Sequence, residues 1–429
     1  MPEFYSEVQE YDTSVGELAD ACAEYNASAL YTSSAAYVVQ DMAAIIVAVE
    51  GREEAKLNYW GLSYGTILGA EFIQTYPERV GRVVLDGVFD AEANAEAYTS
   101  QLPNDELFVR DAITDFARSC EEAGPDTCSL STPSNHTNHS NSTSNIPTRL
   151  STLQASLHRS PMPVTDATGT WSITAGIFSF FMYSFLKLPP TWPIVTTAVS
   201  ALERGDPTLF ASLLTGATTA SVVNTSAPAT GSLAGWPIQC TDNAPSNQTT
   251  LASVARLILD ISLEQETPWL NADLSTLSFC RNFPNTRPRL PNLGASKLTS
   301  DETNSLLTAL NTSVLIINPE HDPTTPVTSA ERLHSWLPTS SQLITRKGPG
   351  HTSISLGSLG LVQKVRKYFL TGEIPMSREV HDVNQVVFGS GIETDTMTPN
   401  AVFDNTLSEK ERVLLESTYV IFKAFMGLP

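Results

Sequence analysis

The chain has 429 residues, of which 41% are hydrophobic and 17% charged, and its 46 acidic against 25 basic residues give a formal net charge of −21. This length allows two or three domains, or one core with a large insertion, and the apolar content is enough for a sizeable core. The negative charge repels nucleic-acid phosphates and anionic lipid, so we expect neither nucleic-acid nor membrane-surface binding.

No segment is typical of a membrane span or a signal peptide. The most apolar run, residues 173–186, is shorter than the roughly 20 residues of a spanning helix. It ends at Lys187 and Pro189-Pro190, which favours a buried helix. The first residues, MPEFYSEVQEY, have neither the basic nor the apolar part of a signal peptide.

Strand and helix patterns alternate near the N-terminus. Apolar residues recur at helical spacing over 36–49, and KLNYW (56–60) then predicts a short strand. GLSYG leads into a helical stretch from Thr66 to Tyr76, which Pro77 ends, and VGRVVL (80–85) predicts a second strand. Strand, helix, strand is the signature of a parallel sheet.

The pattern changes after about residue 91. Residues 105–120 are helical in pattern, whereas 129–146 are a low-complexity polar run with three glycosylation sequons, which predicts an exposed, glycosylated loop. Residues 171–215 predict aromatic-rich helices. We expect the aromatic side chains of 171–185 to face either the active-site cleft or the core of this inserted region.

Sheet patterns return in the last third of the chain. SVLIINPEHD (313–322) predicts an apolar strand, 328–336 a helix, SQLITRK (341–347) a strand and 360–370 a helix. Beyond Pro375 the pattern is weak and ends in a predicted helix at 408–426.

These elements predict an α/β fold in which a parallel-sheet core is interrupted by a helical insertion. Residues 1–90 are expected to form the N-terminal part of the core. Residues 91–310 would form a cap, 311–375 the C-terminal part of the core, and 376–429 a C-terminal extension.

Ser63 is the candidate nucleophile. Gly61-Leu62-Ser63-Tyr64-Gly65 fits the GxSxG elbow, in which the serine stands on a strained turn between a strand and a helix. A serine hydroxyl is a weak nucleophile at neutral pH, so it needs a base within hydrogen-bonding reach and a group that orients that base. The predicted strand before this motif and the helix after it match that context.

Asp322 and His351 are the candidate partners of Ser63. Asp322 directly follows an apolar strand, so its carboxylate is expected over the active edge of the sheet, with Glu320 and Asp86 as weaker alternatives. His351 lies in GPGH after the next strand. The order Ser, Asp, His is that of α/β-hydrolases.

The other histidines fit the role of base less well. His321 and His334 fall on a turn and a helix, and His136 and His139 lie in the polar loop.

The five cysteines favour disulfides over a metal site. None forms a CxxC pair or lies beside histidines at ligand spacing, so we expect no metal and no cofactor. Glycosylation sequons support secretion. They stand at Asn26, Asn135, Asn138, Asn141, Asn224, Asn247 and Asn311.

Residues 55–90, AKLNYWGLSYGTILGAEFIQTYPERVGRVVLDGVFD, resemble the elbow region of the tripeptidyl aminopeptidase and proline iminopeptidase relatives among the α/β-hydrolases. HDPTTPVTSAERL and GPGHTSI resemble the C-terminal part of that family, and TWPIVTTAVSALERGD and WPIQCTD its insertion. The resemblance covers about residues 15–375. It implies a secreted, fungal-type serine exopeptidase.

The chain departs from the family pattern before Ser63. The family has further strands and an HGGPG-like loop ahead of this region, so we interpret the chain as lacking its N-terminal part. The backbone N–H of Tyr64 is then the one oxyanion donor retained. We expect the triad to lie together beside an exposed sheet edge and the chain as given to be a poor catalyst.

The resemblance also bears on the cysteines. Cys22 resembles a family cysteine whose partner would lie upstream, and cysteines that are common in the family after the histidine are absent here. We predict Cys120–Cys128 and Cys240–Cys280 disulfides, with Cys22 unpaired.

The leading hypothesis is a monomeric aminopeptidase that cleaves short peptides from free N-termini through an acyl-enzyme on Ser63. A carboxylate in the cap would bind the substrate ammonium group. An esterase or other acyl hydrolase of the same fold is one alternative, since the triad does not determine the acyl substrate. A truncated, non-catalytic fragment is another.

Overall fold

The computed structural model of the protein describes most of the chain with its side chains. The described residues are 2–90, 102–131, 145–166, 169–220, 235–242, 250–256, 279–283, 299–389 and 401–426.

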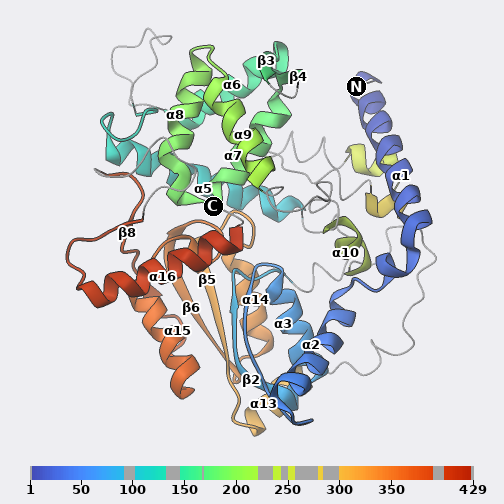
Figure 1. Ribbon diagram of the computed structural model, residues 1–429, viewed down its shortest axis with the longest axis vertical. Helices are drawn as coiled ribbons and strands as arrows, with labels where there is room; N and C mark the ends of the chain where they lie inside the picture. The colour runs from blue at the N-terminus through green and yellow to red at the C-terminus, as the bar shows by residue number, and fades with distance from the viewer. Residues whose placement is uncertain are drawn as a thin grey trace.

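A five-stranded parallel sheet forms the core (Figure 1). The strand order is β1 (Leu57–Leu62), β2 (Val80–Asp86), β5 (Val314–His321), β6 (Ser341–Pro349) and β7 (Val380–His381). In the described part of the chain β1, the strand before Ser63, is at one edge of the sheet.

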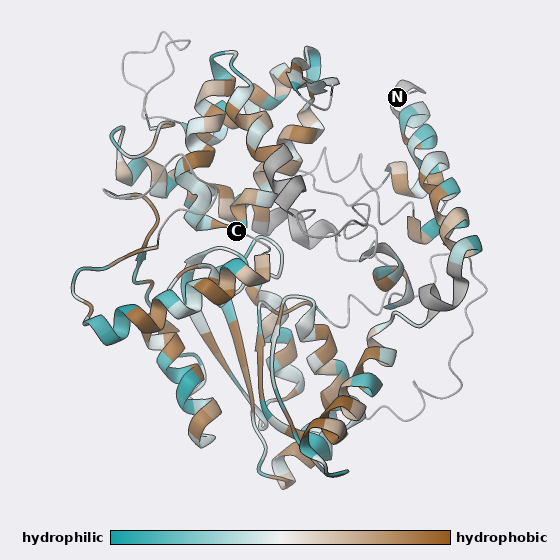
Figure 2. Ribbon diagram, in the orientation of Figure 1, coloured by the Kyte–Doolittle hydropathy of each residue, from teal (hydrophilic) through white to brown (hydrophobic). Residues whose placement is uncertain are grey.

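Helices cover both faces of this sheet because its strands are apolar on both sides. Val83, Leu85 and Ile316 point to one face, and Val84 and Ile317 point to the other. On the first face lie α2 (Ala35–Glu50), α3 (Gly65–Thr75), α13 (Ser300–Ala309) and α14 (Val327–Trp336); on the second lies α15 (Leu359–Thr371). Figure 2 shows the hydrophobic colouring of the strands between these layers.

The predicted α/β class is therefore confirmed. The four strands predicted from the sequence are β1, β2, β5 and β6, with ends displaced by a few residues. The strand β7, which pairs with Thr345 and Arg346 of β6, was not predicted because two residues are too few to show an apolar pattern.

A mainly helical cap lies beyond the carboxyl ends of the strands (Figure 1). It contains α5 (Leu102–Ala123), α6 (Ile146–Arg159), α7 (Ala175–Leu186), the short η3 (Pro189–Thr191), α8 (Trp192–Glu203) and α9 (Thr208–Ala220). Buried aromatic side chains hold these helices together. Phe181 stacks on Phe210 with ring centroids 4.0 Å apart, and Phe116 meets Trp192 edge-on at 5.2 Å.

One element of the cap, a short hairpin, differs from the helices predicted from the sequence. A hairpin of β3 (Met162–Asp166) and β4 (Gly169–Ile173) pairs Val164 with Trp171, so the first residues of the predicted aromatic helix are a strand. Phe178, Phe181 and Phe185 are buried in the cap's own core, which is one of the two expected positions of this aromatic run.

The helices α13 and α1 pack against other parts of the chain than the predicted division into core and cap implies. Leu307 of α13 is buried among core residues, although the cap was predicted to extend to residue 310. α1 (Pro2–Tyr31) packs against residues 279–283 instead of the sheet, since Val15 and Ala19 are buried beside Phe279 and Phe283.

The C-terminal extension joins the core to the cap. It contains the short strands β8 (Gln385–Val386) and β9 (Val402–Phe403) and the helix α16 (Glu409–Met426). Leu415 packs with Phe403 of β9 and with Val362 of the core helix α15, whereas Tyr419 and Phe422 are buried in the cap cluster. α16 is thus part of both layers.

Both predicted disulfides, Cys120–Cys128 and Cys240–Cys280, are present, and Cys22 is free. The predicted glycosylated loop falls largely on residues 132–144, outside the described part. Asn311 is exposed at a turn. No helix among the described residues is long and apolar enough to cross a membrane.

An ion pair joins the cap to the core beside the predicted acid. Nδ1 of His321, at the end of β5, lies 2.5 Å from Oδ2 of Asp115, a buried residue of α5. The hydrogen bond to Asp115 is the main cause that raises the pKa of His321, and it outweighs the opposing effect of burial.

The ion pair predicts a pH-dependent contribution to stability. Because the folded-state pKa of His321 is raised above its unfolded value of about 6.5, the contribution is complete below that value and disappears as pH rises through the folded pKa. His321→Gln should therefore lower the unfolding free energy more at pH 5.5 than at pH 9, as measured by urea unfolding. His158→Gln, at an exposed position of α6, is the control. An equal loss at both pH values would contradict this contribution.

Candidate active site

Ser63 stands on a strained turn between β1 and α3. Its φ of 55° is in the left-handed region, and its N–H donates to the carbonyl of Asp86 at 3.0 Å. The turn is so tight that a Cβ at Gly61 would lie 2.5 Å from the carbonyl oxygen of Gly65, which also accepts a hydrogen bond from the Tyr59 hydroxyl. This crowding explains the glycine at position 61 of the motif.

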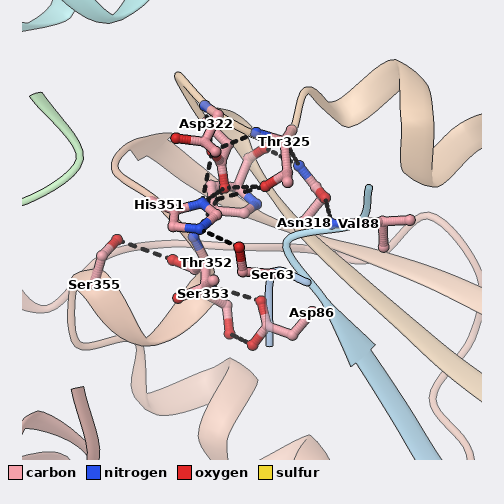
Figure 3. Close-up of polar contacts among 12 residues, drawn as sticks. Ser63, Asp86, Val88, Asn318, Asp322, Thr325, His351, Thr352, Ser353 and Ser355 are labelled. Atoms are coloured by element: carbon pink, nitrogen blue, oxygen red, sulfur yellow. Dashed lines mark hydrogen bonds and ion pairs between the residues drawn. The ribbon is translucent and has the colours of Figure 1, made fainter. Parts of the chain in front are cut away.

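Ser63, His351 and Asp322 form a continuous hydrogen-bonded chain (Figure 3). Oγ of Ser63 lies 2.7 Å from Nε2 of His351, and Nδ1 of His351 lies 3.0 Å from each carboxylate oxygen of Asp322. Asp322 is completely buried and His351 is 4% exposed. The structure therefore brings together all three residues predicted from the sequence.

Hydrogen bonds keep the Asp322 carboxylate ionised and in place. The N–H groups of Thr324 and Thr325 donate to Oδ1, while the Thr325 hydroxyl and the Thr352 N–H donate to Oδ2. Burial raises the pKa of Asp322, but the charge of His351 and the hydrogen bonds from His351, Thr325 and Thr352 outweigh it, so the pKa lies below its ordinary value. A charged acceptor therefore faces Nδ1 of His351.

A buried arginine shapes the loop that carries His351. The Arg346 guanidinium donates to the carbonyls of Lys347, Pro349 and Thr352 and to the hydroxyl of Ser355. Burial lowers the pKa of Arg346 to about 10, so it remains charged at neutral pH. Its bonds support the left-handed conformation of Thr352, whose φ is 64°.

Asp86 and Glu320, the alternative acids, occupy other roles. Asp86 accepts hydrogen bonds from the N–H and hydroxyl of Ser353 at 2.7 and 2.5 Å and from the Trp60 indole at 3.3 Å. Burial raises the pKa of Asp86 to about 6. Glu320 accepts from the N–H of Gly348. Asp86 therefore links the end of β2, the strand next to β1, to the loop that carries His351.

His321 and His334, two of the histidines considered as alternatives to His351, bond to other residues than Ser63. His321 pairs with Asp115, and His334 bonds the hydroxyl of Ser341 at 2.8 Å. His136 and His139 lie outside the described residues.

Tyr64 is the N-cap residue of α3. A helix leaves its first N–H groups without carbonyl partners, so the Tyr64 N–H is a suitable donor to an oxyanion formed beside Ser63.

The cap contacts the loops that carry Asp322 and His351, and the C-terminal helix contacts His351. The N–H of His351 donates to the carbonyl of Lys187 in the cap at 3.0 Å, and the Tyr183 hydroxyl lies 3.4 Å from that of Thr324. The Phe425 ring of α16 lies 6.3 Å from the His351 ring, measured between centroids. The cap and α16 thus both lie next to the loop that carries His351.

In the described ranges, no group of three or more histidine, cysteine, aspartate or glutamate residues could hold a metal ion.

Sequence comparison finds similarity to peptidases and to a putative hydrolase. Residues 278–381, which include Asp322 and His351, match the family model described as TAP-like protein. The chain is 34% identical over 92 residues to a tripeptidyl aminopeptidase of Streptomyces lividans and 35% identical over 83 residues to the serine protease Hip1 of Mycobacterium tuberculosis. It is 24% identical over 311 residues to the putative hydrolase YuaR of Escherichia coli.

These alignments are partial. They cover 21%, 19% and 71% of this chain in the order given, and 17%, 15% and 54% of the three relatives. Each therefore spans less than two thirds of the relative's length.

The crowded elbow predicts a severe effect of Gly61→Ala. The new methyl group would displace the Gly65 carbonyl and with it the start of α3, at a cost of about 1–3 kcal/mol. We expect lower unfolding free energy by denaturant titration together with reduced turnover. Gly176→Ala in α7 is the control, since its nearest contact would be an ordinary 3.8 Å. Equal effects of the two substitutions would contradict the steric account of the elbow.

Proposed function

Because the chain is an α/β-hydrolase of the TAP-like type, we propose that it is a serine exopeptidase that removes short peptides from free N-termini. The observation that carries this proposal is the hydrogen-bonded chain from Ser63 through His351 to Asp322.

In the proposed mechanism His351 is the general base. The Ser63 hydroxyl donates to unprotonated Nε2 of His351 while Nδ1–H donates to Asp322. As Oγ attacks the scissile carbonyl carbon, its proton passes to Nε2, and the buried Asp322 carboxylate stabilises the imidazolium that forms.

The second half of the cycle reverses these proton transfers. Nε2–H gives its proton to the amide nitrogen as the C–N bond breaks, which releases the shortened chain and leaves the N-terminal peptide esterified to Ser63. Water, deprotonated by His351, then hydrolyses the ester. The Tyr64 N–H is placed to stabilise the oxyanion in both steps.

Peptides are proposed as substrates on two grounds. The cap contacts the loops that carry His351 and Asp322, and Phe425 of α16 lies beside His351, so these segments are placed to contact a peptide bound at Ser63. Two of the relatives are named as a tripeptidyl aminopeptidase and a serine protease. We further propose secretion, which the two disulfides and the sequons support.

Substitution of the nucleophile tests the mechanism. Ser63→Ala should lower the turnover of a chromogenic peptide by several orders of magnitude without loss of stability, because it removes the attacking atom. Ser335→Ala, which removes an exposed hydroxyl from α14, should retain the rate. A Ser63→Ala variant with the parental rate would exclude Ser63 as the nucleophile.

Chemical blocking of the substrate tests the exopeptidase assignment. Acetylation of the N-terminus removes the positive charge and adds bulk, so we expect kcat/KM for a tripeptide p-nitroanilide to fall sharply on acetylation. Equal rates on the free and acetylated forms, or faster turnover of a short-chain p-nitrophenyl ester than of either, would favour an endopeptidase or an esterase.

A further inference from the structure

Asp86, the last residue of β2, forms hydrogen bonds on both sides of the contact between Ser63 and His351. Its main-chain carbonyl accepts from the N–H of Ser63 at 3.0 Å. Its carboxylate accepts from Ser353, through the main-chain N–H on Oδ1 at 2.7 Å and through the hydroxyl on Oδ2 at 2.5 Å (Figure 3). Ser353 is two residues after His351, so Asp86 fixes the backbone near both partners of the bond that activates the nucleophile.

Two buried carboxylates hold the segment from His351 to Ser353. Asp322 accepts from Nδ1 of His351 and from the N–H of Thr352, and Asp86 accepts twice from Ser353. Thr352 lies between these attachments in the left-handed region, a conformation that surrounding contacts must maintain. Without the bonds to Asp86, the Ser353 end of the segment is no longer attached to β2, and the imidazole of His351 is less firmly placed.

The donors around Asp86 suit an ionised carboxylate. Besides the two groups of Ser353, the Trp60 indole N–H donates to Oδ2 at 3.3 Å. Two of these three donors are N–H groups, which cannot accept a hydrogen bond from a protonated carboxyl. The Ser353 hydroxyl could accept one, but it would then cease to donate. Protonation of Asp86 therefore weakens the attachment of Ser353.

Burial opposes the negative charge that these donors favour. Burial raises the pKa of Asp86 to about 6, although Ser353, Trp60 and the charge of Arg346 act in the opposite direction. Asp86 thus takes up a proton in mildly acidic solution. Because this pKa lies above the ordinary value of 3.8, the folded state binds that proton more readily than the unfolded chain. Protonation of Asp86 therefore changes the contact without favouring unfolding.

The other charged and titratable groups near the end of β2 keep their charge states in this range. Arg346 of β6 stays charged, since its pKa is about 10, and the pKa of Asp322 lies below its ordinary value, so its carboxylate is ionised. The phenols on neighbouring elements are neutral because burial raises each pKa: they are Tyr59 on β1, Tyr64 before α3 and Tyr368 on α15. Asp86 is thus the carboxyl of this group that is protonated in mild acid.

We propose that Asp86 is a positioning residue for His351, and that catalysis requires the Asp86 carboxylate to be ionised as well as His351 to be unprotonated. Asp86 acts through Ser353 rather than on the reacting atoms. The inference rests on the Ser63–His351 part of the proposed function and is independent of the substrate being a peptide. Its consequence is that two protons, instead of one, abolish activity as the pH falls.

The pH dependence of fluorophosphonate labelling at Ser63 tests this role, because the labelling needs an activated serine but no peptide. In the parent protein, the logarithm of the labelling rate should fall with a slope of about 2 at the acid end of a series from pH 4.5 to 8. In Asp86→Asn the slope should be about 1. The rate of this variant at pH 7.5 should be about 10- to 100-fold lower, because small displacements of a catalytic group are costly.

Ser353→Ala tests the same contact and leaves the carboxylate in place. Its hydroxyl bond lowers the pKa of Asp86, so its removal should move the acid midpoint of labelling to higher pH. Ser341→Ala is the matched control, since it removes a buried hydroxyl from the other end of β6 and should keep the parental profile. Circular dichroism at each pH checks the fold. If Asp86→Asn does not fold, the midpoint of Ser353→Ala decides the test.

The outcomes separate this inference from the exopeptidase assignment. An acid slope of about 1 in the parent, an unchanged slope in Asp86→Asn or an unchanged midpoint in Ser353→Ala would overturn the role of Asp86. A rate that falls by the same factor at every pH would make Asp86 a structural residue only. If the parent shows the expected profile but cleaves no free peptide, the exopeptidase assignment is wrong and the role of Asp86 stands.

Discussion

The hydrogen bond between Ser63 and His351 is the contact on which the account depends. It joins residues 288 positions apart, and each is held in a constrained backbone turn. Ser63 is left-handed and Thr352, next to His351, is left-handed as well. Neither turn is favourable for a residue with a side chain, so both require surrounding contacts to maintain them.

Those contacts come from buried polar groups. Arg346 holds the carbonyls of the His351 loop, and Asp86 holds Ser353 while its own carbonyl accepts from Ser63. Because a buried charge is costly unless it is satisfied, Arg346 and Asp86 are tolerated only where their hydrogen bonds are made. The triad geometry is thus a property of a network that spans β2, β6 and the loops between them.

The residues of the triad were predictable from the sequence because each follows a strand with a strong apolar pattern. The elbow motif, HDP and GPGH stand at the ends of β1, β5 and β6. The short hairpin β3–β4 and the packing of α1 against residues 279–283 were not predictable, since these depend on contacts between distant segments. The hydrogen bond between Tyr64 and Asp242 was not predictable for the same reason.

The rate at which a fluorophosphonate labels the protein measures the central claim most directly, because the reagent reports the nucleophilicity of an activated serine. The account predicts that mass spectrometry finds the adduct on Ser63 and that Asp322→Asn slows labelling by about 10⁴-fold, since His351 then loses its orienting acceptor. An adduct on another residue, or an unchanged labelling rate in Asp322→Asn, would contradict it.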